Sequence, residues 1–135
     1  MAIIVQKFGG TSVADVKKIH NVASAVIKEK NKGNDVVVVV SAMGHTTDYL
    51  VKLANDVTTA PDSREMDMLL ATGEQVAIAL LTMAIQSYGY KAISMNAQQV
   101  GIITECVHTT ARIVDVKTEK LEKESKEINF IITLS

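Results

Sequence analysis

Residues 35–44 read DVVVVVSAMG, a run of five valines followed by small residues. Valine is β-branched and favours strands over helices. No polar residue alternates with the valines, as would be typical of a strand with one face in water. The run therefore predicts a strand of a parallel sheet whose two faces are both covered.

The segment before this strand predicts a helix and another strand. Residues 2–8 are apolar enough for a buried strand, and residues 13–31 place their apolar side chains on one face of a helix. We expect Thr11 or Ser12 to cap this helix and Gly33 to end it. The order strand, helix, strand favours a right-handed crossover between parallel strands.

The segment after the valine run continues the alternation of helices and strands. A long helix with Ser63 as its N-cap is expected to be interrupted at Thr72-Gly73-Glu74 and to end at Gly89. The sequence thus predicts an α/β fold with a mostly parallel sheet and helices on both faces, in three layers. The elements expected here are helices at residues 46–58, 65–87 and 117–127, strands at residues 90–95 and 128–135, and a hairpin over residues 101–116.

Composition limits the class of protein. A chain of 135 residues suffices for one domain with a sizeable core, and 47% of the residues are apolar. A net charge of −1 argues against a broad basic surface for nucleic acid. No apolar run reaches membrane-spanning length, no secretion signal is recognisable, and the single cysteine excludes an internal disulfide. We therefore expect a cytoplasmic protein with no nucleic-acid or membrane partner.

The turn after the first strand carries the sequence KFGGTS, residues 7–12. Adjacent glycines let the backbone approach a ligand closely, and a following helix offers unpaired N–H groups and the positive end of its dipole. Together with the charge of Lys7, these features predict an anion site that is best suited to phosphate. Taken alone, the two glycines are also compatible with a plain strand-to-helix turn.

Two further segments carry candidate binding residues. Ser41, Thr46 and Thr47 follow the valine strand, and ligands collect at the carboxyl ends of strands in parallel sheets. The alternative for either threonine is capping of the next helix. Glu74 lies among apolar residues, where a charge is costly if buried and unpaired, so it suggests a cationic partner such as a substrate ammonium group. The alternative for Glu74 is an exposed carboxylate at a kink.

The remaining candidates give weaker signals. His20, His45 and His108 lack metal-ligand spacing, so we expect no metal site in the protein. His45 adjoins the loop after the valine strand and is placed to touch a ligand there. We expect a structural role for Cys106 and an ion pair for Arg112.

Four segments together resemble the aspartate kinases of the amino acid kinase superfamily. The resemblance covers about residues 2–128, and four glycine-containing motifs in this order are far more specific than any one of them. It implies ATP with Mg²⁺ and L-aspartate as partners, and phosphoryl transfer to the β-carboxylate, the first step toward lysine, threonine and methionine. The four segments are VQKFGGTSV (5–13), VVVVVSAMG with TTD behind it (36–48), REMDMLLATGEQ (64–75) and GIITECVHTTARIVDV (101–116).

The resemblance also implies roles by position. Thr47 and Glu74 match aspartate-binding positions, with Glu74 holding the α-ammonium group. Lys7 would stabilise charge on the transferring phosphoryl group, and the Mg²⁺ contacts are expected from the substrate phosphates and from later parts of such a domain. The positions that match the family's phosphate and nucleotide contacts are Lys7, Phe8, Gly9, Gly10 and Ser41.

Members of this family continue past the point at which this sequence ends, with glycine-rich segments that complete the nucleotide site. We therefore expect residues 1–135 to form the N-terminal part of an amino acid kinase domain, without a regulatory ACT domain. Such an incomplete sheet exposes an edge and an apolar face, which predicts self-association or a complementary chain. We expect little or no turnover from the chain alone. The alternatives are a non-catalytic phosphate- or aspartate-binding fragment and another kinase of the superfamily.

Overall fold

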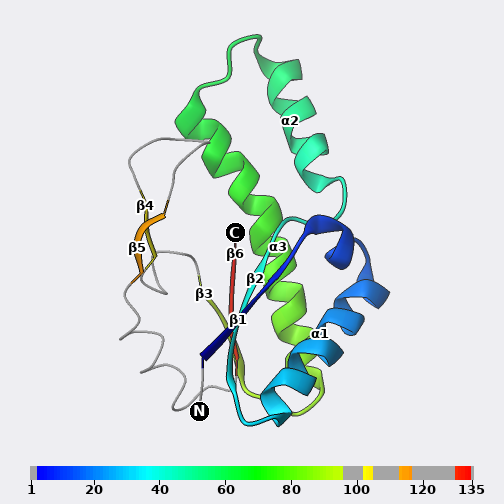
Figure 1. Cartoon of the computed structure of the whole chain (residues 1–135). Coiled ribbons are helices and arrows are strands. Elements are labelled where there is room, and N and C mark those ends of the chain that lie inside the picture. The colour runs from blue at the N-terminus through cyan, green and yellow to red at the C-terminus, as the bar shows by residue number, and fades with distance from the viewer. Residues whose placement is uncertain (1–2, 96–101, 105–112, 117–129, 135) are drawn as a thin grey trace.

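A sheet of four parallel strands organises the described part of the chain (Figure 1). The computed structural model describes residues 3–95, 102–104, 113–116 and 130–134. Its elements are β1 (Ile3–Phe8), the short 3₁₀ helix η1 (Gly10–Val13), α1 (Val16–Asn31), β2 (Asp35–Val40), α2 (Thr46–Val57), α3 (Ser63–Ser87), β3 (Ala92–Met95), β4 (Ile102–Thr104), β5 (Ile113–Val116) and β6 (Phe130–Leu134).

The strand order β1-β2-β6-β3 places the valine strand between two others. β2 pairs in parallel with β1 and with β6, in registers that join Val40 to Phe8 on one side and to Leu134 on the other. The prediction of a parallel α/β fold built on this strand is confirmed, and β4 with β5 confirms the predicted hairpin. The buried valines of β2 are Val36, Val37, Val38 and Val40.

Helices α1 and α3 cover one face of the sheet and pack against each other (Figure 1). Burial of aliphatic side chains between this helical layer and the sheet is the main source of stability. The predicted helix at residues 117–127 lies outside the described residues. The buried apolar residues of this core are Val13, Ile19, Val22, Ala23, Val26, Val36, Val38, Val40, Ala77, Ile78, Leu81, Ala84, Ile85, Ala92, Phe130 and Ile132.

Helix α3 runs without interruption through the segment where the sequence predicted a break. The expectation of an interruption at residues 72–74 is therefore wrong, and Gly73 is buried inside the helix. Among the described helices, α3 is also the one long and apolar enough, by length and composition, to cross a membrane. In this fold α3 is a core helix, because it packs on α1 and on the sheet.

The residues that cap the two long helices differ from the predicted ones. The side chain of Asp15 caps α1, and that of Asp62 caps α3; each accepts a hydrogen bond from the backbone N–H three residues later, at 2.8 and 3.0 Å. The predicted cap Ser63 is instead the first residue of α3, while Thr11 and Ser12 lie within η1. The sequence pattern could not show that a separate 3₁₀ turn precedes α1.

The predicted ends of these helices are confirmed. Gly33 follows α1 with φ of 94°, and Gly89 follows α3 with φ of 89°. L-residues with a side chain rarely adopt this left-handed conformation, so glycine is the residue that ends a helix in this way at little cost.

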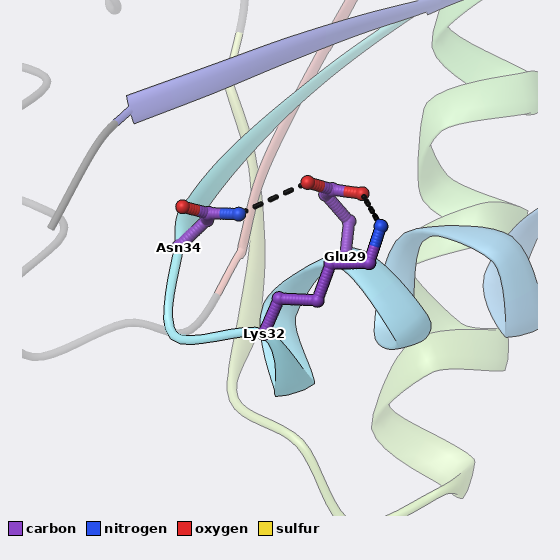
Figure 2. Close-up of polar contacts among 3 residues, drawn as sticks. All are labelled: Glu29, Lys32 and Asn34. Carbon is purple, nitrogen blue, oxygen red and sulfur yellow. Dashed lines mark hydrogen bonds and ion pairs between the residues drawn. The ribbon is translucent and has the colours of Figure 1, made fainter.

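Polar side chains fasten the end of α1 to the start of β2 (Figure 2). The Glu29 carboxylate accepts a hydrogen bond from Asn34 Nδ2 at 2.9 Å and pairs with Lys32 Nζ at 3.1 Å. The Glu29 side chain is 21% exposed and that of Lys32 is 67% exposed. The bond to Asn34 is partly buried, whereas the ion pair with Lys32 is exposed, and a hydrogen bond to a charged group contributes more where water screens it less.

We predict that Glu29→Ala lowers the free energy of unfolding by about 1 kcal/mol, because it removes both contacts and leaves the Asn34 amide without this partner. Lys32→Ala is the matched control and should change the free energy by less than about 0.5 kcal/mol, since its ion pair is exposed. Urea unfolding followed by circular dichroism measures both. Equal losses in the two variants would contradict the importance of the Asn34 bond.

Candidate functional site

The turns after β1 and β2 are joined through their backbones at the carboxyl edge of the sheet. Ser41 N–H donates to Phe8 O at 3.2 Å, and Gly44 N–H donates to Gly10 O at 2.9 Å. The two loops that the sequence singled out therefore lie side by side, as expected for consecutive parallel strands.

Gly10 and Gly9 differ in what the fold requires of them. A Cβ atom on Gly10 would lie 2.7 Å from the backbone oxygen of Ala42, which is a clash with a rigid group. A Cβ on Gly9 would meet nothing within 4 Å, and its φ of −79° is accessible to any residue. Gly10 is thus needed for the close approach of the two loops, whereas the surroundings of Gly9 leave space beside an exposed backbone.

Helix α3 approaches the β2–α2 loop from its other side. A Cβ on Gly73 would lie 3.0 Å from Thr46 Cγ2, 3.2 Å from Ala42 Cβ and 3.3 Å from Leu50 Cδ1. Ala42, itself 4% exposed, is therefore held between Gly10 and Gly73. We call the close approach of Ala42 to Gly10 and to Gly73 the Ala42 junction. The glycine that the sequence marked as a helix breaker is a packing position within a continuous helix.

The two predicted aspartate-binding residues directly follow Thr46 and Gly73, whose positions lie in close contact beside the Ala42 junction. Thr47 follows Thr46 in the first turn of α2 and is exposed, while Glu74 follows Gly73 on α3 and is half-buried. No side chain caps α2, whose N-cap position is His45, so capping does not explain either threonine. The structure thus brings the chain segments of Thr47 and Glu74 together.

Lys7 and Phe8 leave β1 on opposite faces of the sheet. Phe8 packs against the core beneath the helices, so its side chain anchors the strand. Lys7 is exposed. Because successive side chains of a strand point to opposite faces, and Lys7 directly precedes Phe8, Lys7 lies on the face away from α1 and α3. Within the described part of the chain, the side chain of Lys7 makes no hydrogen bond or ion pair.

Helix α1 begins farther from the two glycines than the sequence predicted. The turn η1 separates the glycines from α1, and the Asp15 carboxylate occupies the first turn of that helix. A carboxylate at this position already satisfies a free N–H group and complements the helix dipole. Any anion site here therefore depends on the backbone of the Gly9–Gly10 turn and on Lys7.

The remaining candidates are His45 in the loop after β2, His20 on α1, and three residues outside the described ranges. His45 has a side chain 97% exposed and lies 3.4 Å from Asp48 Oδ2, and His20 Nδ1 is 2.9 Å from the hydroxyl of Tyr88. Within the described ranges, no three His, Cys, Asp or Glu side chains gather as a metal site. The candidates outside the described residues are Cys106, His108 and Arg112.

Two apolar grooves in the described part of the chain are distinct from these segments. One of about 300 Å³ lies between α2 and the start of α3, and the other, of about 270 Å³, lies between α1 and α3. Neither groove is lined by Lys7, Gly9, Ser41, Thr47 or Glu74. The candidate site is therefore separate from both of these grooves.

The chain matches known proteins over almost its whole length. The profile of the amino acid kinase family matches residues 2–135. The aspartokinase of Bacillus sp. (strain MGA3) is 58% identical over 132 residues, and aspartokinase 2 of Bacillus subtilis (strain 168) is 55% identical over 132 residues. Each match covers 98% of this chain and 32% of the relative, so the chain spans about a third of the length of these curated relatives.

Solved structures show the same fold. The aspartate kinase from Synechocystis matches with a TM-score of 0.79 and 47% identity, over 98% of this chain and 21% of that chain. Aspartokinase III of E. coli in complex with aspartate and ADP matches with a TM-score of 0.73 over 98% of this chain and 40% of that chain. At 21% identity, the second similarity speaks for the fold alone.

The two adjacent glycines are predicted to respond differently to alanine. Gly10→Ala should lower the free energy of unfolding by about 1–3 kcal/mol, because its Cβ would overlap Ala42 O and push the loops apart. Gly9→Ala is the control and should change it by less than about 0.5 kcal/mol, since its Cβ meets open space. Urea unfolding decides this, and equal stability of the two variants would argue against the close approach at Ala42.

Proposed function

The chain belongs to the amino acid kinase family, and we propose that it forms part of an aspartate kinase. The reaction breaks the bond between the γ-phosphorus and the bridging oxygen of ATP and forms a bond from that phosphorus to the β-carboxylate of L-aspartate. The products are ADP and 4-phospho-L-aspartate, a step of amino-acid biosynthesis. The similarity to bacterial aspartokinases supports this reaction and a cytoplasmic location.

The Ala42 junction is the observation that carries the proposal. It brings the turn after β1, the loop after β2 and the middle of α3 to one edge of the sheet. Phosphoryl transfer depends mainly on positioning two substrates and neutralising charge, and little on covalent chemistry by the protein. An edge that gathers a lysine, exposed backbone and a carboxylate suits those tasks.

The phosphate side of the proposed site is the turn after β1. The exposed backbone around Gly9 has room for phosphate oxygens to approach. Ser41 lies next to this turn, because its backbone N–H donates to Phe8 O. Lys7 would supply a positive charge to the transferring group. Mg²⁺ would arrive bound to the ATP phosphates, whose charge it neutralises, with further contacts from later parts of such a domain.

The aspartate side lies where α2 and α3 meet. Glu74 would bind the α-ammonium group of L-aspartate, and the hydroxyl of Thr47 would contact one of its carboxylates. A half-buried carboxylate attracts a cation more strongly than an exposed one, because water screens it less. The attacking β-carboxylate is already ionised at neutral pH, so the reaction needs no general base.

Glu74→Gln is predicted to weaken L-aspartate binding by at least about ten-fold, equivalent to about 1.4 kcal/mol, because the amide cannot neutralise the ammonium group. Calorimetric titration measures this, with succinate as the comparison ligand, since succinate lacks the ammonium group. The wild-type chain should prefer L-aspartate over succinate, and the variant should lose most of that preference.

Glu65→Gln is the matched control for this prediction. Glu65 lies on the same helix but in its exposed first turn, where it pairs with Arg64 at 2.7 Å. This control should bind L-aspartate as the wild type does. An unchanged preference for L-aspartate in the Glu74 variant would remove Glu74 from the site.

Turnover is predicted to require more than this chain. The experiment is a coupled assay for aspartyl phosphate with the 135-residue chain alone and with a second polypeptide that carries the unmatched part of Bacillus subtilis aspartokinase 2. We expect activity only in the mixture, and sedimentation should show a complex with that chain or a self-associated state. Binding of both substrates without activity in the mixture would favour the alternative, a non-catalytic binding fragment.

A substrate panel separates this proposal from the other alternative. A kinase of the same family with a different substrate would turn over acetylglutamate, carbamate or UMP in the mixture, and would leave L-aspartate unchanged.

A further inference from the structure

We propose that Gly73 is a positioning residue, which sets the separation of Thr47 and Glu74 by allowing α3 to approach the first turn of α2. This inference rests on the proposed function, because Thr47 and Glu74 matter only if they bind the same substrate. Gly73 itself makes no contact with substrate in this proposal. It acts by setting the positions of Thr47 and Glu74.

The geometry links the two binding residues through their neighbours. Gly73 directly precedes Glu74, and Thr46 directly precedes Thr47. A Cβ on Gly73 would lie 3.0 Å from Thr46 Cγ2, closer than side chains normally approach. Consecutive residues of a helix move together with its backbone, so any change in the Gly73–Thr46 contact changes the separation of Thr47 and Glu74.

The other contacts of Gly73 limit how a side chain could be accommodated. Ala42 Cβ at 3.2 Å and Leu50 Cδ1 at 3.3 Å close the space on further sides. On its other side, the backbone oxygen of Ala42 faces Gly10, at a position that a Cβ on Gly10 would approach to 2.7 Å. On this inference, added volume at position 73 shifts α3 away from the first turn of α2, because a closely packed interior transmits such strain.

Helix propensity argues against a glycine at this position. Gly73 lies in the middle of a continuous helix of 25 residues, where alanine is the better helix former. Its backbone does not adopt the left-handed conformation seen at Gly33 and Gly89. Close packing is thus the property of glycine that the described structure uses at position 73.

The test is a cycle of three variants: Gly73→Ala, Thr46→Ser and the double variant. Gly73→Ala should weaken L-aspartate binding by about ten-fold, as measured by calorimetry, with the affinity for ATP unchanged. Thr46→Ser removes the methyl group nearest to the new Cβ. It should leave binding unchanged by itself and restore most of the affinity in the double variant.

Ala84→Val is the control for overpacking of α3 in general. Ala84 lines the groove between α1 and α3, three helical turns from Gly73, and is 8% exposed. The added methyl groups should lower the melting temperature through strain in the core. They should leave the affinity for L-aspartate unchanged, which separates loss of stability from misplacement of Glu74.

Crystal structures of the wild type and of the Gly73→Ala variant decide the inference independently of binding. The Cα atoms of Thr47 and Glu74 should lie farther apart in the variant and return in the double variant. Unchanged separation and affinity, or failure of Thr46→Ser to restore either, would overturn the positioning role. A wild-type chain that does not bind L-aspartate would instead defeat the proposed function, while the measured Cα separation would still decide the geometry.

Discussion

The candidate site depends on how closely three chain segments approach Ala42. Its backbone oxygen faces Gly10 and its side chain faces Gly73, so a side chain at either glycine would separate the segments. Hydrogen bonds between the two loops hold the same arrangement from the backbone side. The positions of the turn after β1, of the first turn of α2 and of the middle of α3 are therefore coupled.

The sequence alone predicted those parts of the fold that a single local pattern determines. The valine run predicted a covered parallel strand, and β2 has strands on both sides. The pattern could not predict that β6 would lie between β2 and β3, because strand order depends on long-range packing. It also misjudged Gly73, since a helix propensity describes an isolated helix and contains no information about a neighbouring loop.

The candidate site was predicted as a set of segments but not as a geometry. Lys7, Ser41, Thr47 and Glu74 were all selected from the sequence, by their positions after strands or by resemblance to the aspartate kinases. The distinction between Gly9, which has open space, and Gly10, which is packed, required the structure. The sequence alone did not show that α1 begins only at Val16, where the side chain of Asp15 caps it.

The most direct measurement is a crystal structure of the chain with L-aspartate and a non-hydrolysable ATP analogue. The proposed arrangement predicts L-aspartate between Thr47 and Glu74, with its ammonium group at the Glu74 carboxylate. It also predicts phosphate oxygens beside the backbone of Gly9 and the ammonium group of Lys7. L-aspartate bound elsewhere, such as in the groove between α2 and α3, or phosphates bound away from the turn after β1, would contradict a shared site built on the Ala42 junction.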